Sequence, residues 1–381
     1  MHVDTRLIYA DSQKGFNEFL SENFLSCKLL GVSSYVGGVV VPGPVGAVVL
    51  NNKYLVETMS YTVRCPEKFR VIPSSDKVVE CNEEVLFLGS FESCWGHCIT
   101  DNLKHLWILH SPLLEQYRSM KWVYAMELPE KGLPKNFIEL LAVLGLNLSQ
   151  LVLIDRPTKF NVVHVPDSCF YCDDATSQHY RYYTKEFVEL VDCIVDTVDP
   201  ARDCNPQRKV YLTRTGWKKG NPDFGERYVE KAFVAKGFEV VRPESLSFVE
   251  TVRLMGQCKA LAATEGSTAH NSIFLPKGSE LVVVRKADYI NEYQPPINQL
   301  RDLDVVYIDA HRTTLLASAR CPFSGPFFIY CNENLAKYAG IGWRFPLVDW
   351  CWYVVFCIYG KLCGNINKYL ARLKRIFRRL G

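Results

Sequence analysis

Residues 259–284 read KALAATEGSTAHNSIFLPKGSELVVV, and this stretch decides the fold class. Its two apolar runs, Lys259–Ala263 and Glu280–Val284, have the composition and length of strands. Between them, Thr268–Phe274 has the length and pattern of a short helix. A strand, a helix and a second strand in this order predict a right-handed βαβ unit with parallel strands.

The same alternation continues on both sides of this unit. A capping box formed by Ser247 and Glu250 marks the start of one of the predicted helices. The series predicts an α/β fold with a doubly wound parallel sheet. Its further predicted elements are strands at 209–213, 238–241 and 305–308 and helices at 226–236 and 247–257.

The part of the chain before residue 200 has a different pattern. Short apolar runs separated by turn residues predict strands, and the spacing of large apolar residues predicts one helix over Cys94–His110. The proline-containing stretch Asp199–Pro206 is a plausible linker. With 381 residues, the chain is long enough for two domains. We expect an N-terminal domain at 1–200, a second domain at 201–312, and a C-terminal return segment and tail at 313–381.

Composition narrows the class of protein. A chain that is 48% hydrophobic and 22% charged is typical of a folded globular protein. The first sixteen residues contain no apolar run of the kind found in secretory signals, and the 15 cysteines are an odd number. Both features predict a cytoplasmic protein with reduced thiols. Seven of the basic residues lie in 361–381, so residues 1–360 carry a net charge of −4, which argues against nucleic acid as the chief partner.

Polar residues follow the predicted strands of the parallel sheet, at the edge where such sheets bind ligands. These residues are Arg214, Arg242, Glu244, Glu265, Gly266, Ser267, Thr268 and Arg285. Arginine grips phosphate oxygens, and a hydroxyl of Ser267 or Thr268 could cap a helix whose N-terminus attracts an anion. The pattern favours a diphosphate site, with the two glutamates accepting hydrogen bonds from sugar hydroxyls. The alternative is an ordinary polar loop surface, and the spacing alone does not decide between them.

A second candidate site lies in the predicted helix over Cys94–His110. His97 and Asp101 are four residues apart and share a helix face, with Trp95 near its start. A histidine beside a carboxylate can act as a general base. The alternative is a purely structural pair, which the sequence alone favours. The chain has neither a GxGxxG motif after its first strand nor a P-loop, which argues against a dehydrogenase or a P-loop ATPase.

The C-terminal tail has two parts. Residues 345–363 are rich in aromatic side chains, but their longest uncharged stretch is too short to span a bilayer. In 366–380, apolar side chains share one helical face and basic ones occupy the rest. This pattern favours an amphipathic helix that binds an anionic membrane surface. The alternative is a helix that docks on the protein's own core.

Four short motifs follow one another between Val85 and Ile308. They read GHCITD at 96–101, LTR at 212–214, GFEVVRPE at 237–244, and EGS at 265–267 leading to Asn271 and FLPKG at 274–278. Their types and order resemble those of glycosyltransferase family 61, the capsular-polysaccharide type. Residues 265–269 read EGSTA where many family members have Gly-x-His-Gly-Ala, and the basic tail lies outside the family pattern.

The resemblance implies a GT-B-like fold, in which two Rossmann-like domains face a cleft. It also implies that a sugar is transferred from a nucleotide-sugar donor with inversion of configuration. This reaction would need neither a metal nor a cofactor, and the donor is expected to be UDP-linked. In this interpretation either His97 or Asp101 is the base, and the sequence does not decide which of the two has this role. The donor-binding residues would be Arg214, Arg242, Glu244, Glu265, Gly266, Ser267, Thr268 and Asn271.

Together these features predict an enzyme on the cytosolic face of a membrane. It would extend a cell-surface polysaccharide or a lipid-linked glycan, held there by residues 345–381. Two alternatives stay open. One is a metal-dependent sugar or phosphoryl transferase that uses Asp302 and Asp304, and the other is a glycan-binding module without catalysis.

Overall fold

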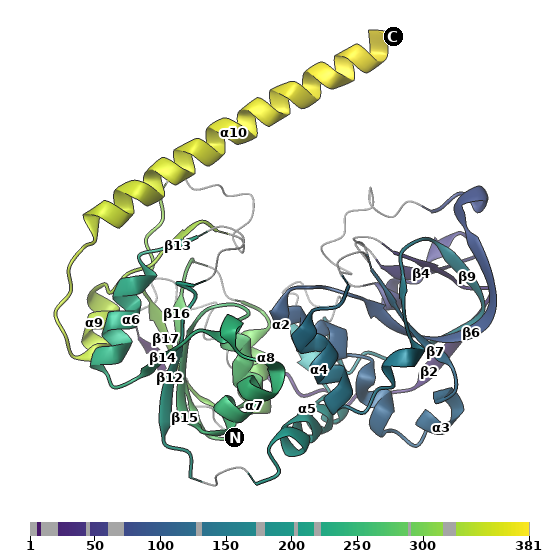
Figure 1. Ribbon diagram of the computed structural model, residues 1–381, viewed down its shortest axis with the longest axis horizontal. Helices are drawn as coiled ribbons and strands as arrows, with labels where there is room; N and C mark the ends of the chain where they lie inside the picture. Colours follow the sequence, from purple (N-terminus) through teal and green to yellow (C-terminus); the bar gives the residue numbers. More distant parts are fainter. Residues whose placement is uncertain are drawn as a thin grey trace.

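The computed structural model describes residues 6–8, 22–42, 46–59, 72–126, 132–172, 180–201, 205–216, 222–288, 291–314 and 325–380, with side chains described only between 22 and 363. Its elements gather around two sheets. In Figure 1, the green and yellow elements of the C-terminal half surround one sheet, and the blue and teal elements of the N-terminal half surround the other.

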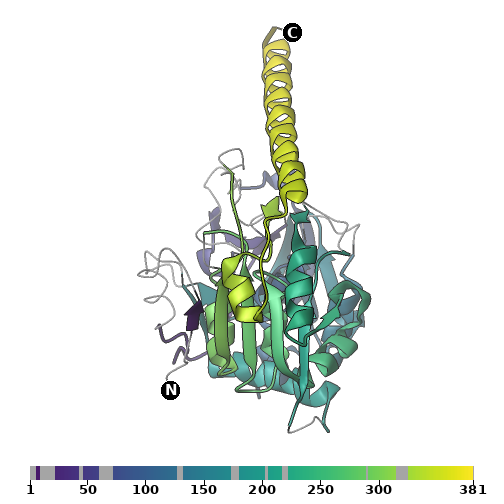
Figure 2. The same cartoon turned by 90° about the vertical axis from the view of Figure 1, so that its left-hand side faces the viewer.

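The C-terminal sheet has six strands, and all of its pairs are parallel, which confirms the predicted parallel sheet. Edge strand β1 comes from the N-terminal end of the chain and pairs with the last strand of the series, as Figure 2 shows in dark purple. This sheet therefore draws on residues that we expected in the domain at 1–200. The order is β1 (Arg6–Ile8), β17 (Asp304–Asp309), β16 (Glu280–Arg285), β15 (Cys258–Thr264), β12 (Arg208–Leu212) and β14 (Glu239–Val241).

Helices cover both faces of this sheet because its side chains alternate between two separate cores. Leu261 and Val283 point to one core, and Ala262 and Val282 point to the other. Helices α7 (Phe248–Gly256) and α8 (Gln294–Leu300) and the 3-10 helix η9 (Ala269–Phe274) pack on the first side. Helices α6 (Glu226–Ala235) and α9 (Glu333–Ala339) pack on the second. The capping box at Ser247 and Glu250 is present at the start of α7.

The N-terminal sheet is mixed. Strands β9, β6, β7 and β8 are parallel neighbours, whereas β2, β3, β4 and β5 pair antiparallel. Only the first group resembles the second Rossmann-like sheet that we expected. The strands are β2 (Val32–Val36), β3 (Val39–Val41), β4 (Ala47–Leu50), β5 (Lys53–Tyr54), β6 (Val79–Ser90), β7 (Lys121–Ala125), β8 (Leu151–Ile154) and β9 (Thr158–Pro166).

The two halves share one hydrophobic core. Helices α4 (Lys135–Val143) and α5 (Lys185–Val198) of the N-terminal half contact α7 of the C-terminal half. Buried side chains of all three helices belong to a single cluster. A two-stranded sheet of β10 (Phe170–Cys172) and β11 (Arg181–Tyr183) lies beside α8. Because this core is continuous, side chains from both halves can reach one site.

The predicted helix over Cys94–His110 is wrong as a single element. The structure has three short turns there, α2 (Trp95–Cys98), η4 (Asp101–Leu103) and η5 (Leu106–His110), followed by α3 (Leu114–Tyr117). The break falls at Thr100, whose φ of −132° and ψ of −87° are not helical and whose side chain is fully buried. All of residues 98–108 are buried, so tertiary packing rather than helical periodicity sets the conformation.

The C-terminal tail forms one continuous helix, α10 (Leu347–Leu380), which projects from the body in Figures 1 and 2. Gly360 does not interrupt it, since a glycine inside a helix costs only about 1 kcal/mol. On one side of its first turns, Tyr353 and Cys357 pack against Phe328 of β18 (Phe327–Phe328), which pairs with β13 (Asp223–Phe224). The first turns of α10 therefore pack on the body, whereas the side chains of 366–380, to which the two predicted alternatives refer, lie outside the described ones.

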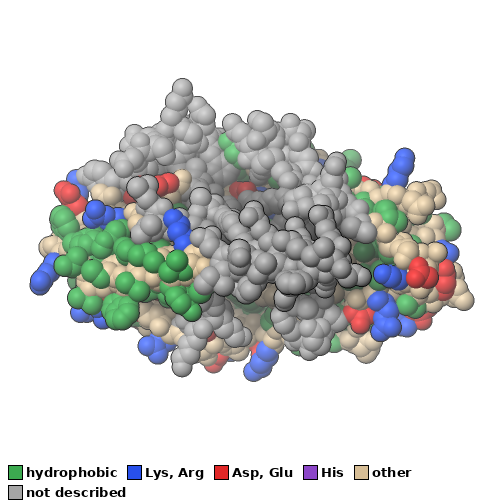
Figure 3. All heavy atoms as spheres, turned by 90° about the horizontal axis from the view of Figure 1, so that it is seen from above, with side chains coloured by type: hydrophobic (Ala, Val, Ile, Leu, Met, Phe, Trp, Pro, Cys, Tyr) green, Lys and Arg blue, Asp and Glu red, His purple; other side chains and the backbone are tan. Residues whose placement is uncertain are grey.

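The opposite side of α10 is apolar and exposed. Figure 3 shows hydrophobic side chains gathered over the part of the surface where α10 begins. They recur at intervals of three and four residues: Val348, Trp352, Val355, Tyr359 and Leu362, with exposed fractions of 66%, 64%, 54%, 66% and 56%. Over the described ranges, none of the helices combines the length and apolar character needed to cross a bilayer.

Candidate active site

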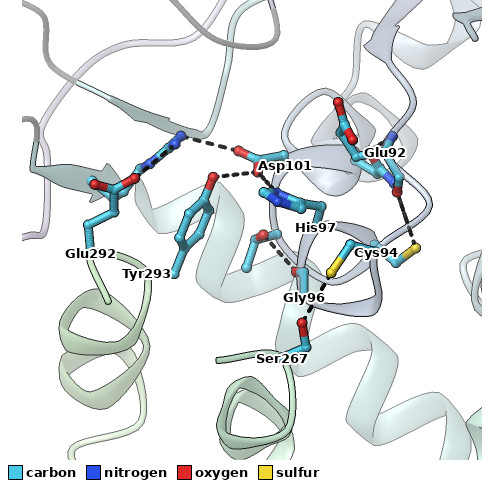
Figure 4. Close-up of polar contacts among 12 residues, drawn as sticks. Glu92, Cys94, Gly96, His97, Asp101, Ser267, Glu292 and Tyr293 are labelled. Carbon is cyan, nitrogen blue, oxygen red and sulfur yellow. Dashed lines mark hydrogen bonds and ion pairs between the residues drawn. The ribbon is translucent and has the colours of Figure 1, made fainter. Parts of the chain in front are cut away.

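Two segments from different halves meet at Gly96 in α2. A Cβ atom at Gly96 would lie 2.8 Å from His270 Nδ1 and 2.9 Å from Ser267 Oγ, so only glycine fits without a shift. Cys94 Sγ lies 3.2 Å from Ser267 Oγ, and Trp95 Nε1 donates to Asn271 Oδ1 at 3.0 Å. Figure 4 shows Cys94 and Gly96 directly above Ser267. The segment that carries His97 therefore lies against the turn that follows β15.

The predicted pair of His97 and Asp101 forms, although α2 ends between the two residues. His97 Nδ1 lies 2.5 Å from Asp101 Oδ2 (Figure 4). Asp101 accepts two more hydrogen bonds, from Tyr293 Oη to Oδ2 at 2.8 Å and from Arg181 Nη1 to Oδ1 at 3.2 Å. Asp101 is 6% exposed, so these protein groups rather than water satisfy its charge.

The groups around this pair shift the pKa values of both residues. Burial would raise the pKa of Asp101, but the charge of Arg181 and the hydrogen bond from His97 outweigh it and hold that pKa well below its usual range. Burial would lower the pKa of His97, but its hydrogen bond to Asp101 raises it above the ordinary value. Because the Asp101 carboxylate can only accept, His97 Nδ1 is the donor, and Nε2 is the basic nitrogen of the neutral ring.

The turn at 265–271 differs from its predicted form. Neither Ser267 nor Thr268 caps the following helix, and that helix is a six-residue 3-10 helix, too short for a helix-dipole anion site. Instead, the Asn271 side chain donates to the carbonyl oxygens of Ser267 and Thr268. Gly266 has φ +109° and faces open space, so the turn requires glycine for its backbone conformation.

Arg214 lies next to this turn because β12 and β15 are neighbours. Leu212 pairs with Ala263, so Arg214 and Glu265 occupy matching positions just beyond the two strands. The backbone N–H of Arg214 donates to Glu226, and its side chain contacts Asp223 at 3.2 Å. Lys286 Nζ lies 3.8 Å from the same Asp223 oxygen. Two cations thus share one carboxylate at this edge of the sheet.

Glu265 and Arg285 are both almost fully buried. Burial raises the pKa of Glu265 to about 7, against the opposing effects of the Asn291 N–H bond and the charges of Arg285 and Lys286. Its Oε1 accepts from the Asn291 N–H, whereas Oε2 has no hydrogen-bond partner among the described residues. Arg285 Nη1 lies 2.5 Å from Asp309 Oδ1, so its charge is already matched by a close carboxylate, whereas Lys286 lies 3.8 Å from Asp223.

Arg242 and Glu244 lie at the outer side of Arg214. Both contact the position of Gly216, in the loop after β12. Since β14 and β15 flank β12 on opposite sides, these two residues are separated from Glu265 by the β12 strand. The predicted donor-binding set therefore spans three neighbouring strand ends.

Sequence reasoning missed several groups at this site. Arg181 and Tyr293 reach Asp101 from 80 and 192 positions away in the chain, and no local pattern marks them. His270 is buried beside His97, and burial lowers its pKa to about 4, so it is neutral. Of these residues, only Lys286 could have been found from the sequence, because it directly follows strand β16, which ends at the same edge of the sheet.

Asp302 and Asp304 lie at the opposite end of the sheet. Asp304 is the first residue of β17, whereas the candidate site follows the carboxyl ends of β12 and β15. Both aspartates are exposed. Within the described ranges, no three metal-binding side chains gather anywhere. These aspartates therefore cannot serve the site at Arg214 and Gly266.

The close approach at Gly96 yields a stability prediction. Gly96→Ala should lower the free energy of unfolding by about 1–3 kcal/mol, because the new methyl group overlaps Ser267 and His270. Urea unfolding of the full chain measures this. Gly360→Ala is the control, since no atom lies within 4 Å of a Cβ there and we expect no loss. Equal losses in the two variants would contradict the close contact.

Comparison with known proteins agrees with this geometry. None of the curated proteins searched matches the chain. The family model described as Glycosyltransferase 61 matches residues 95–282, which include α2, the turn after β15 and most of the parallel sheet. Members of a glycosyltransferase family use a sugar donor and an acceptor. The chain thus contains, over residues 95–282, a domain of the glycosyltransferase 61 family.

Proposed function

We propose that the protein is a GT-B-like, inverting glycosyltransferase that moves a sugar from a UDP-linked donor to a hydroxyl of a glycan or lipid-linked acceptor. The observation that carries this proposal is the contact between α2 and the turn at 265–271. It brings a histidine–carboxylate pair from one half against the strand ends that follow β12 and β15 in the other. A base and an anion site in contact are what a single displacement of a diphosphate requires.

In the proposed reaction His97 is the base. Its Nε2 takes the proton of the acceptor hydroxyl as that oxygen attacks the anomeric carbon of the donor. The bond between the anomeric carbon and the diphosphate oxygen breaks, and the configuration inverts. Asp101 keeps the proton on Nδ1 and stabilises the imidazolium. Asp101 is a poor base itself, because three donors hold it and its pKa lies far below neutral.

Cationic side chains would stabilise the departing diphosphate. Arg214 and Lys286 share Asp223 as their partner and lie at the strand ends beside Gly266, whose Cα faces open space. Ser267, Arg242 and Glu244 would contact the sugar or the nucleotide. We assign Glu265, Thr268 and Asn271 to supporting the turn, because all three are buried and Asn271 bonds within it.

Nucleotide binding tests this assignment without knowledge of the acceptor. UDP at a hundredfold excess over its Kd should add about 2.7 kcal/mol of stability and raise the Tm of the wild type. Lys286→Met should reduce that rise, since it removes a buried charge at the diphosphate site. Lys259→Met, which alters an exposed lysine of β15 at the other end of the sheet, is the control. If GDP or CMP raises the Tm but UDP does not, the donor carries that other nucleotide instead of UDP. If none of the three nucleotides raises the Tm, the proposed diphosphate site is contradicted.

Metal independence has its own test. We expect transfer to continue in excess EDTA, and Asp302→Ala and Asp304→Ala to leave its rate unchanged, because both side chains are remote from the site. Loss of transfer in EDTA that added Mg²⁺ or Mn²⁺ restores would favour the metal-dependent alternative. An Asp302→Ala variant without activity would identify its ligand.

We further propose that the enzyme works at the cytosolic face of a membrane, in the synthesis of a capsule or another cell-surface polysaccharide. The exposed apolar side of α10 and the basic residues of its predicted second half support this location. An acceptor tethered to the same bilayer would gain effective concentration.

A further inference from the structure

Asp101 is held by groups from outside its own segment. Arg181, in β11, approaches Oδ1, and Tyr293, directly before α8, donates to Oδ2. The two also contact each other, since the Arg181 guanidinium carbon lies 4.3 Å from the centre of the Tyr293 ring. Both residues are 7% exposed. The His97 ring meets the Tyr293 ring edge to face at 5.4 Å.

The residues next to Tyr293 connect this arrangement to the strand end after β15. The Asn291 N–H donates to Glu265, and Asn291 Oδ1 accepts from the Tyr293 N–H at 3.1 Å. Glu292 Oε1 lies 3.6 Å from Arg181 Nη2 (Figure 4). The segment 291–293 therefore joins the turn at 265–271 to Asp101 through three successive residues. The geometry of the pair depends on the C-terminal half as well as on α2.

We infer that Arg181 and Tyr293 are positioning residues for the proposed base, fixing the Asp101 carboxylate so that it holds His97 through Nδ1 and leaves proton transfer to Nε2. The inference rests on the proposed function for its catalytic meaning, although its structural part does not require transfer. Neither side chain needs to touch a substrate. Their effect passes through Asp101, whose two oxygens they share with His97.

The same contacts limit how strongly Asp101 attracts a proton to His97. Tyr293 competes with His97 for the same oxygen, and the positive charge of Arg181 offsets the charge of Asp101. Without Arg181 and Tyr293, the full negative charge of the Asp101 carboxylate would act on His97 and raise its pKa. The ring would then be an imidazolium, which cannot serve as a base. Other charged or titratable groups facing the pair are Glu92, Cys94, Lys104, His270 and Glu292.

Titration of His97 in the full-length protein tests the inference without a substrate. Carbon-13-labelled histidine gives one imidazole signal for each of the eight histidines, and the signal lost in His97→Gln assigns His97. In Tyr293→Phe we expect the pKa of His97 to rise by about half a pH unit or more, because one competing donor is lost. Arg181→Gln should raise it further. Tyr183→Phe is the control. Tyr183 lies on the same strand as Arg181, but its buried hydroxyl bonds to Gln299, so its loss should leave the pKa of His97 unchanged.

The outcomes separate the inference from the proposed function. A His97 pKa in Tyr293→Phe equal to that in wild type and Tyr183→Phe overturns the inference, and so does a wild-type neutral ring protonated on Nε2. If transfer is detected, the acid limb of kcat/KM should move to higher pH in Tyr293→Phe, which a merely structural loss would not cause. A raised pKa together with full transfer in His97→Gln supports the positioning contacts but overturns the proposed base.

Discussion

Replacing His97 by glutamine should lower the rate of sugar transfer by about two to four orders of magnitude while nucleotide binding stays intact. Glutamine keeps a polar side chain of similar size but cannot take a proton from the acceptor hydroxyl. Initial rates of transfer from a panel of nucleotide sugars measure this, with nucleotide-induced Tm shifts as the test of folding. His164→Gln is the matched control, because His164 lies on β9 and contacts Ser34 and Glu84.

Asp101→Ala separates the two members of the pair. If His97 is the base, the alanine variant should keep more activity than His97→Gln, because Nε2 of a less well oriented ring can still accept a proton. If the Asp101 variant is inactive and the separate His97→Gln variant is fully active, Asp101 is the base. If the wild type transfers no sugar from any donor yet binds glycans, the protein is the non-catalytic binding module.

The second large effect concerns α10. Replacing Trp352, Val355 and Tyr359 together by glutamine should weaken binding to anionic vesicles by at least about a hundredfold. Each side chain is more than half exposed, and burying one in the headgroup region contributes on the order of 1.5–3 kcal/mol. Sedimentation with vesicles containing phosphatidylglycerol measures the loss. These substitutions are cleaner than deleting the tail, which would also strip Tyr353 and Cys357 from Phe328.

A matched control for this prediction lies in the N-terminal half. Leu29→Gln with Val36→Gln removes two side chains that are 89% and 76% exposed, and should not affect vesicle binding. Vesicle binding that survives the α10 substitutions would contradict the membrane proposal. A dimer in wild-type solution that the same substitutions dissociate would show that α10 binds a second copy of the chain instead.

The C-terminal sheet could be predicted because its signals are local. Runs such as Leu281–Val284 are apolar throughout, as strands buried on both faces must be, and the capping box at Ser247 marks a helix start. The predicted bounds there differ from the structure by about one residue. The sequence predicts the tail in two parts, an aromatic stretch at 345–363 and an amphipathic helix at 366–380, whereas α10 runs without a break from Leu347 to Leu380.

The candidate site could be predicted only in part. His97 and Asp101 are four positions apart, so their hydrogen bond has a local signal, even though the helix that suggested it is broken at Thr100. Arg181 and Tyr293 have no such signal, because only the packing of β11 and α8 brings them to Asp101. The burial of Glu265 likewise depends on Asn291, in a segment whose sequence has no recognisable motif.

A crystal structure with bound UDP would test the central claim most directly. We predict that the diphosphate lies at the carboxyl ends of β12 and β15, against Arg214, Lys286 and the backbone of Gly266, with its terminal phosphate on the side of His97. UDP bound at the Asp304 end of the sheet, or with its diphosphate turned away from α2, would contradict the account.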